Sequence, residues 1–164
     1  MTYFDRIRID QVTAGEVALH RVTIHITDER KLSGALCLLV EGEQARPRIA
    51  GCAFTGGARC AFFHRSGGSL TASTFAGSRH AALDVMCPES PPGEEFAFPE
   101  GAVATDPPKG GWPLPFISGV TVKNNTGVGV WIRMHTARGF ALGPGNAFEN
   151  NRLMDIRDGR ELLL

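Results

Sequence analysis

A repeat of two short apolar segments around a glycine or asparagine corner constrains the fold of this chain more than any other feature. Residues 49–65 align without a gap with residues 70–86 at an offset of 21. Residues 117–133 fall in the same columns, and residues 143–157 join them at a further offset of 26. A unit this short cannot bury its apolar face alone, so we expect the units to stack on one another.

The corner of each unit holds a residue type that tolerates a left-handed backbone. The corner column contains Gly56, Gly77, Asn124 and Asn150, and glycine and asparagine adopt positive φ more readily than other residues. Apolar residues alternate on both sides of the corner, and the two-residue period of a β-strand turns one set inward. We therefore predict that the chain bends at the same height in every unit.

The predicted inward columns follow from this alignment. They are Ile49, Leu70 and Ile117; Phe54, Phe75, Val122 and Phe148; Cys60, Ala81, Val128 and Met154; and Phe62, Leu83, Val130 and Ile156. Upstream the match is looser, with Ile26, Cys37 and Leu39 in register and extra residues at the corner. Residues 7–9 and 17–19 are expected to form a frayed first unit.

The rest of the composition favours an all-β fold. Glycine contributes 20 of the 164 residues, and no stretch of twelve or more residues shows clean helical spacing of apolar residues. Short apolar runs separated by Gly, Asn and Ser are typical of β-strands. Stacked units of this kind predict a parallel solenoid, whereas a Gly-rich β-sandwich or jelly roll is the alternative.

The column pattern over residues 22–86 and 117–157 resembles right-handed parallel β-helix proteins, the pectate-lyase-like and phage-tailspike-like group. This resemblance implies a short single-stranded right-handed parallel β-helix of about five coils. In that group, stacked asparagines at a turn bond their neighbours above and below, which implies a contact between Asn124 and Asn150. The two upstream units carry glycine at this column, so we expect the ladder to be short.

A proline-rich insertion interrupts the repeat at residues 87–116. Eight of the ten prolines of the chain lie there, and proline cannot donate to a strand ladder. The segment also holds large apolar residues, so we expect it to cover one side of the solenoid or to wall a groove. These residues are Phe96, Phe98, Val103, Trp112, Leu114 and Phe116.

Because the repeat resumes after the insertion, residues 1–164 are predicted to form a single β-helix domain. Residues 1–21 are expected to be an N-terminal cap or frayed coil. Residues 158–164, which end in three leucines, are expected to cap the last unit or to pack against another copy in a homo-oligomer. A solenoid must hide or pair its terminal edges, which is the reason for both expectations.

Charge and hydropathy exclude several partners. Lys and Arg number 17 and Asp and Glu number 17, so the basic excess needed for nucleic acid or for an anionic membrane surface is missing. No apolar run approaches the roughly 18 residues of a transmembrane helix. No signal peptide is visible in the first ten residues, and this leaves the localisation of the protein open.

The four cysteines, Cys37, Cys52, Cys60 and Cys87, contain no CxxC pair. Zinc sites usually need close ligand pairs, so we expect small buried thiols and neither a metal nor another cofactor. A Cys52–Cys60 disulfide is an unsupported alternative. None of the five histidines has an HxH or HExxH spacing.

The best candidate site is a surface made from two predicted outward columns. One column holds Phe63, Asp84, Trp131 and Arg157, and the other holds Arg65, Met86 and Arg133. Sugars stack on aromatic faces and hydrogen-bond to guanidinium and carboxylate groups. The candidate ligand residues for a polysaccharide or cell-surface glycan are therefore Trp131, Arg133, Asp84, Arg65, Phe63 and Arg157. The alternative without a binding role is a solvated face whose Trp131 lies under the insertion.

We expect a non-catalytic module for glycan or cell-surface recognition or for structural assembly. The alternative is a carbohydrate-active enzyme, a polysaccharide lyase or glycoside hydrolase, with a groove walled by residues 87–116. Glycoside hydrolysis needs two carboxylates roughly 5–9 Å apart, and Asp84 has no such neighbour in adjacent columns. The resemblance implies lyases with clustered Ca²⁺-binding acids beside an Arg or Lys base, and the clustered acids are missing. No catalytic residues are therefore predicted.

Overall fold

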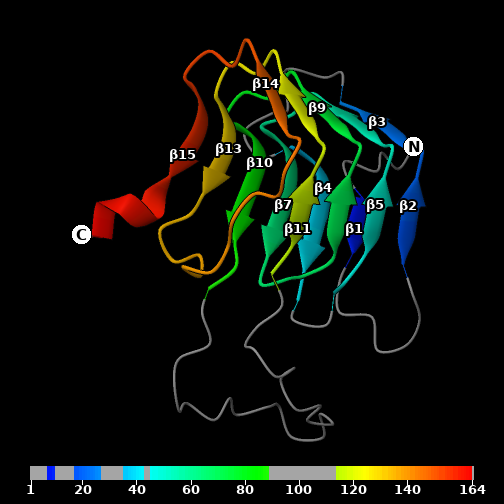
Figure 1. The fold of residues 1–164 in the computed structure, drawn as a ribbon. Coiled ribbons are helices and arrows are strands. Elements are labelled where there is room, and N and C mark those ends of the chain that lie inside the picture. The colour runs from blue at the N-terminus through cyan, green and yellow to red at the C-terminus, as the bar shows by residue number, and fades with distance from the viewer. Residues whose placement is uncertain (1–6, 10–16, 27–34, 43–44, 89–113, 164) are drawn as a thin grey trace, which may run out of the picture.

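The structure, a computed structural model, describes residues 7–9, 17–26, 35–42, 45–88 and 114–163. It is all-β, and its strands form three parallel sheets (Figure 1). Sheet A has the order β1 (Ile7–Ile9), β4 (Leu36–Glu41), β7 (Arg59–His64), β10 (Ala81–Met86), β13 (Val128–Ile132) and β15 (Met154–Asp158). Sheet B has the order β11 (Phe116–Ser118), β8 (Ser69–Thr71), β5 (Arg48–Ala50) and β2 (Ala18–His20). Sheet C has the order β14 (Ala147–Glu149), β12 (Thr121–Lys123), β9 (Thr74–Ala76), β6 (Ala53–Thr55) and β3 (Thr23–His25).

The chain passes through sheets B, C and A in turn, and we call each such passage a coil. The coils are β2–β3–β4, β5–β6–β7, β8–β9–β10 and β11–β12–β13, followed by a last coil with only β14 and β15. Each strand pairs in parallel with its equivalent in the next coil. The repeat therefore has three strands, not the two predicted, because a second corner divides the first apolar segment. This topology is compatible with a parallel β-helix.

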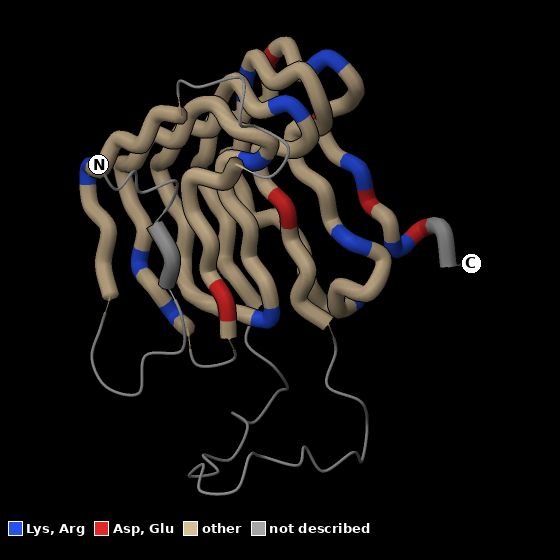
Figure 2. The backbone as a smooth tube through the Cα atoms, turned by 180° about the vertical axis from the view of Figure 1, so that it is seen from behind, with Lys and Arg blue, Asp and Glu red and all other residues tan. Residues whose placement is uncertain are grey.

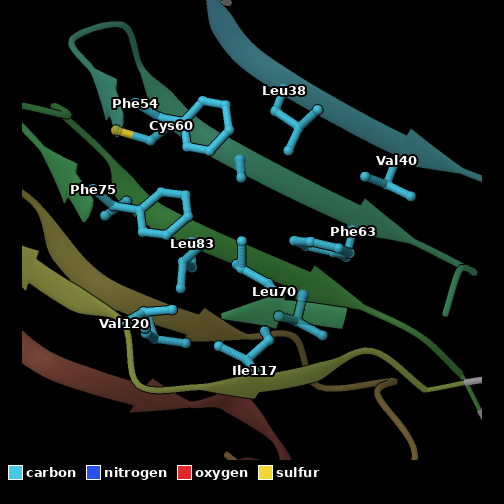
Figure 3. Close-up of a cluster of buried hydrophobic side chains, with 14 of the residues drawn as sticks. Leu38, Val40, Phe54, Cys60, Phe63, Leu70, Phe75, Leu83, Ile117 and Val120 are labelled. Carbon is cyan, nitrogen blue, oxygen red and sulfur yellow. The ribbon is translucent and has the colours of Figure 1, made fainter. Parts of the chain in front are cut away.

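The inward columns of sheets B and C are as predicted from residue 49 onward, whereas upstream Ile24, and not Ile26, lies opposite Phe54. In sheet B, Ile49 pairs with Leu70 and Leu70 with Ile117. In sheet C, the column runs through Phe54, Phe75, Val122 and Phe148, of which all but Phe148 are fully buried. Figure 3 shows Phe54, Phe75, Leu70 and Ile117 in one core with side chains of sheet A such as Leu38 and Leu83. Equivalent residues of successive coils thus share one environment.

The predicted corner column has the expected backbone. The φ angles are 85° at Gly56, 71° at Gly77, 55° at Asn124 and 53° at Asn150. Each of these residues follows a strand of sheet C and precedes a strand of sheet A. The predicted bend is therefore confirmed in these four coils, and the corresponding corner of the first coil lies outside the described residues.

A second corner column, between sheets B and C, was not predicted. It contains Arg21, Gly51, Ala72, Gly119 and Gly145, all with φ between 47° and 79°. Two members, Arg21 and Ala72, are residue types that rarely adopt positive φ. For this reason the residue types at these positions did not reveal the column. An added Cβ on Gly145 lies 3.7 Å from Cα of Gly119, so these corners also stack.

Asparagines form a ladder at the first corner, mainly through the second residue of each Asn-Asn pair. The Asn125 side chain is buried, accepts from the backbone N–H and hydroxyl of Ser78 at 2.9 Å, and donates to Asn151 Oδ1 at 2.8 Å. The predicted contact between Asn124 and Asn150 is longer, 3.5 Å, and exposed. Two coils share the ladder, and Ser78 continues it into a third.

The gapless alignment fails in one strand, β7. Three residues separate β6 from β7, whereas four separate β9 from β10. The N–H groups of His80 and Ala81 both donate to Ala58 O, which marks the extra residue. A one-residue slip reverses every side chain, so Phe63 pairs with Val85 in the core and Phe62 takes the outward position beside Asp84.

The ends and the insertion are described in part. Cys87, Pro88 and residues 114–116 flank the segment 89–113, and Pro88 forms an antiparallel bridge with Thr136. Whether the insertion covers a side or walls a groove lies outside the described residues, as do Phe96, Phe98, Val103 and Trp112. No helix in the described ranges is long and apolar enough to span a membrane.

The predicted terminal segments contain regular structure. Residues 1–21 include β1, which pairs with β4, and β2, which pairs with β5. After Asp158, the 3₁₀ helix η2 (Gly159–Leu163) leads away from the stack (Figure 1). Arg160 anchors η2 by donating to the carbonyls of Ala137 and Phe140 at 2.9 Å. Met154 and Ile156 stay exposed beside it.

Candidate functional site

The outer face of sheet A brings three of the predicted site residues together. Asp84 lies opposite Trp131, and Trp131 lies opposite Arg157 in neighbouring strands. Phe62 completes this column, in the place predicted for Phe63. Phe63 is fully buried in the core, so its assignment as a ligand residue is wrong.

Arg133 and Arg65 have different positions relative to this column. Arg133 directly follows β13, two residues after Trp131, and its N–H donates to Val85 O. Arg65 follows β7 with φ at 50° and donates its backbone N–H to Met86 O. His64, not Arg65, lies opposite Met86 in the ladder. The structure therefore places Arg133 beside Trp131 and leaves Arg65 at an exposed turn.

Asp84 is held by two arginines and is inaccessible to solvent. Its carboxylate accepts from Arg133 Nε at 2.7 Å and Arg133 Nη2 at 2.6 Å, and Arg59 Nε lies 2.8 Å from its Oδ2. The hydrogen bonds that Arg133 donates to Asp84 raise the pKa of Arg133. The side chain of Asp84 is 0% exposed, so its assignment as a ligand residue is also wrong, while the side chains of Arg59 and Arg133 are 34% and 25% exposed. This bidentate geometry is the strong form of an ion pair.

Trp131 carries two guanidinium groups at its ring. Arg133 Cζ lies 3.6 Å from the ring centroid and Arg157 Cζ lies 4.7 Å from it. Cations are attracted to the indole face, with an energy of about 0.5–2 kcal/mol each. The half-buried indole is thus flanked by two planar guanidinium groups. We call the surface made of Trp131, Arg133 and Arg157 the Trp131 ledge.

Further planar groups continue the row toward the N-terminal coils. Phe62 stacks on His64 with ring centroids 5.5 Å apart, and Arg59 Cζ lies 5.5 Å from the Phe62 centroid. Nδ1 of His64 lies 3.1 Å from Glu41 Oε1. Arg59 was missed by the sequence analysis because its side chain comes from the start of β7 and reaches Asp84 in the next strand.

Positive charge exceeds negative charge around the ledge. Arg59 and Arg133 pair with the carboxylate of Asp84, and Arg157 lies at the Trp131 ring. Among the described residues, Arg157 contacts the indole and no carboxylate, and it is exposed. The surface can therefore attract an anionic group while its aromatic edge offers an apolar contact.

Asp84 offers no accessible carboxylate for acid–base chemistry on this face. Both of its oxygens are engaged by arginine, and its side chain is 0% exposed. The described residues contain no group of three or more His, Cys, Asp or Glu side chains placed to hold a metal ion. The arrangement is suited to holding a ligand by contact and charge.

The four cysteines are buried free thiols, as predicted. Cys37 and Cys60 lie opposite each other in β4 and β7, between two ladder pairs. The hydrogen bond between their side chains lowers the pKa of Cys37 and raises that of Cys60, which burial raises further. Cys52 instead contacts the carbonyl of Leu19, and the structure contains no Cys52–Cys60 bridge.

Comparison with known proteins adds no family to this description. The chain matches no protein-family model, and neither the curated proteins nor the solved structures show a significant similarity to it.

Proposed function

We propose that this protein is a non-catalytic recognition module built on a right-handed parallel β-helix, and that it binds glycans on the outer face of sheet A. The fold proposal is supported by the regular passage of the chain through sheets B, C and A around one core. Right-handed crossovers join parallel strands of one sheet in about 98% of cases, which supports the handedness.

The observation that carries the function is the Trp131 ledge. A half-buried indole flanked by two arginines combines an apolar ring with N–H donors, and amphipathic aromatic and arginine groups dominate recognition surfaces. Arg133 is fixed by its bidentate bond to Asp84. Such pre-organisation lowers the entropic cost of binding.

The charge of the ledge supports a saccharide that carries a carboxylate or another anionic substituent. Arg157 is exposed and has no carboxylate partner among the described residues. An anion beside it would gain charge-assisted hydrogen bonds. Asp84 is a support for Arg133 in this proposal and does not contact ligand, because its side chain is 0% exposed.

The rival function, a lyase or hydrolase, is less well supported. It needs a carboxylate free to exchange a proton near the scissile bond, whereas the carboxylate of Asp84 is bound by Arg133 and Arg59. The recognition proposal uses the same residues without requiring that any of them change protonation.

A glycan array with matched neutral and acidic saccharides tests the proposal. We expect binding to acidic members, at least tenfold weaker for Trp131→Ala and for Arg157→Ala. Phe116→Ala is the control, because Phe116 is 52% exposed on sheet B, and it should bind like the parent. Absence of binding, or equal binding by Trp131→Ala, would contradict the proposal. Shortened or unsaturated products would favour the enzyme instead.

A further inference from the structure

The C-terminal end of the stack is apolar and exposed. Met154 and Ile156 lie over Val128 and Val130, which are 4% and 0% exposed, yet they are themselves 46% and 43% exposed. Leu153 beside them is 67% exposed. These three residues belong to the last coil, whose strand β15 ends sheet A. We call them, with β15, the terminal face.

The N-terminal end is less exposed in the described part of the chain. Leu19 and Ile24, the inward residues of β2 and β3, are half-buried and pack against the core. Sheet A also extends there to β1, one strand beyond β2 and β3. Of the five large apolar residues that are exposed in the described part of the chain, three therefore lie at this C-terminal end.

The two ends do not fit each other. Sheets A, B and C contain six, four and five strands. If β15 of one copy paired with β1 of the next, the strands of the described residues would leave sheet B two strands short and sheet C one strand short at the junction. Head-to-tail stacking therefore leaves a gap in the core, and a partner made of the same end is favoured.

The charges on β15 fit a second copy in the opposite direction. β15 reads Met-Asp-Ile-Arg-Asp, and an antiparallel pair centred on Ile156 places Asp155 of one copy opposite Arg157 of the other, twice. Opposite charges across a strand pair are stabilising, whereas like charges are destabilising. Figure 2 shows acidic and basic positions close together at this end.

We propose that two copies of this chain associate through the terminal face by antiparallel pairing of β15 about a two-fold axis at Ile156. The pairing satisfies the open edge of sheet A and covers Met154 and Ile156. A two-fold interface of this kind is closed and self-complementary, so it ends at a dimer. Arg157 belongs both to the Trp131 ledge and to the terminal face. The two proposals can still be tested separately, because Trp131→Ala removes the ledge and leaves the terminal face intact.

The mass of the protein in solution, measured by light scattering from about 1 µM to about 1 mM, a range that covers weak to moderate affinities, tests the proposal. The mass should rise from 17.6 kDa toward twice that value. Ile156→Lys should weaken association at least 100-fold, because it places a charge in an apolar contact. Phe116→Lys, a charge on an exposed apolar residue of another sheet, should leave it unchanged.

A charge exchange tests the register. Asp155→Arg and Arg157→Asp should each weaken the homodimer, since each places like charges opposite one another. An equimolar mixture of the two variants should form heterodimers, which restore both pairs, and native mass spectrometry distinguishes them. A single 17.6 kDa species at every concentration, a dimer insensitive to Ile156→Lys, or a mixture without preference for heterodimers would overturn the proposal.

Discussion

The rings of Phe54 and Phe75 stack with centroids 5.2 Å apart and planes 16° from parallel. The two residues occupy equivalent positions in neighbouring coils of sheet C and are fully buried. Stacked aromatic pairs contribute about 0.5–1.5 kcal/mol beyond the area they bury. Distance along the sequence is converted here into height along the stack, and this conversion brings the Trp131 ledge together on sheet A.

Phe75→Ala should lower the free energy of unfolding by about 3–5 kcal/mol, because it leaves a cavity between two coils. Urea denaturation followed by circular dichroism measures the change. Phe116→Ala is the matched control and should change stability by less than about 0.5 kcal/mol, since Phe116 is 52% exposed. Equal losses for both variants would show that Phe75 does not lie in the interior.

Adjacent phenylalanines in β7 test the one-residue shift. Phe63 is 0% exposed in the core, whereas Phe62 lies on the outer face. Phe63→Ala should cost about 3–5 kcal/mol, and Phe62→Ala about 1 kcal/mol, as expected of a partly exposed side chain. The same denaturation experiment compares them, and the reverse order would restore the gapless alignment.

Asp84→Asn should destabilise the fold by about 2–4 kcal/mol. Breaking one side of a buried ion pair leaves the other side uncompensated, and here two arginines lose a carboxylate that is 0% exposed. Asp155→Asn, at an exposed carboxylate, is the control and should cost less than about 1 kcal/mol. If both substitutions lower the free energy of unfolding equally, the ion pairs of Asp84 with Arg59 and Arg133 do not form in solution.

Ala72→Gly should stabilise the protein by about 0.5–1 kcal/mol, because positive φ strains a residue with a Cβ. Ala72 has φ at 47° in the second corner column. Ala76→Gly, in strand β9, is the comparison and should destabilise by about 0.5–1 kcal/mol. Thermal unfolding of both variants decides between these signs, and a loss at Ala72 would mean that this corner has another conformation.

Acid should weaken the anchor of η2. The hydrogen bond from Arg160 lowers the pKa of Asp158 below its ordinary value of 3.8, so the native state holds this proton less tightly than the unfolded state. The stability from Asp158 is present above about pH 4 and is lost as pH falls through the lowered pKa. Asp158→Asn should therefore show a smaller loss of stability between pH 5 and pH 2 (roughly the span of a carboxyl titration) than the parent. An unchanged pH profile would contradict the pairing.

Short strands and one corner column could be predicted because their signals are local. Period-2 alternation set the core faces of Phe54 and Phe75, and Gly56 and Asn124 marked positive φ by residue type. The predicted pairing between sheet B strands of successive coils is also correct, as shown by Ile49 opposite Leu70.

Other features depend on tertiary context. The corner at Ala72 has a residue type that avoids positive φ, so only packing against its neighbours imposes it. The shift in β7 comes from one residue fewer in a corner, which a gapless comparison cannot detect. Arg59 joins the site through a long side chain that crosses to Asp84 in the next strand. The alignment of repeats does not predict the direction of this side chain.

Nuclear Overhauser effects between side chains of the sheet C column, ring-to-ring and ring-to-methyl, test the stacking of coils most directly. Phe75 should show contacts both with Phe54, 21 residues earlier, and with Val122, 47 residues later. Strong Hα–Hα contacts between these strands, typical of antiparallel pairing, together with missing Phe75–Val122 contacts, would contradict the stacked parallel fold and the surface built on it.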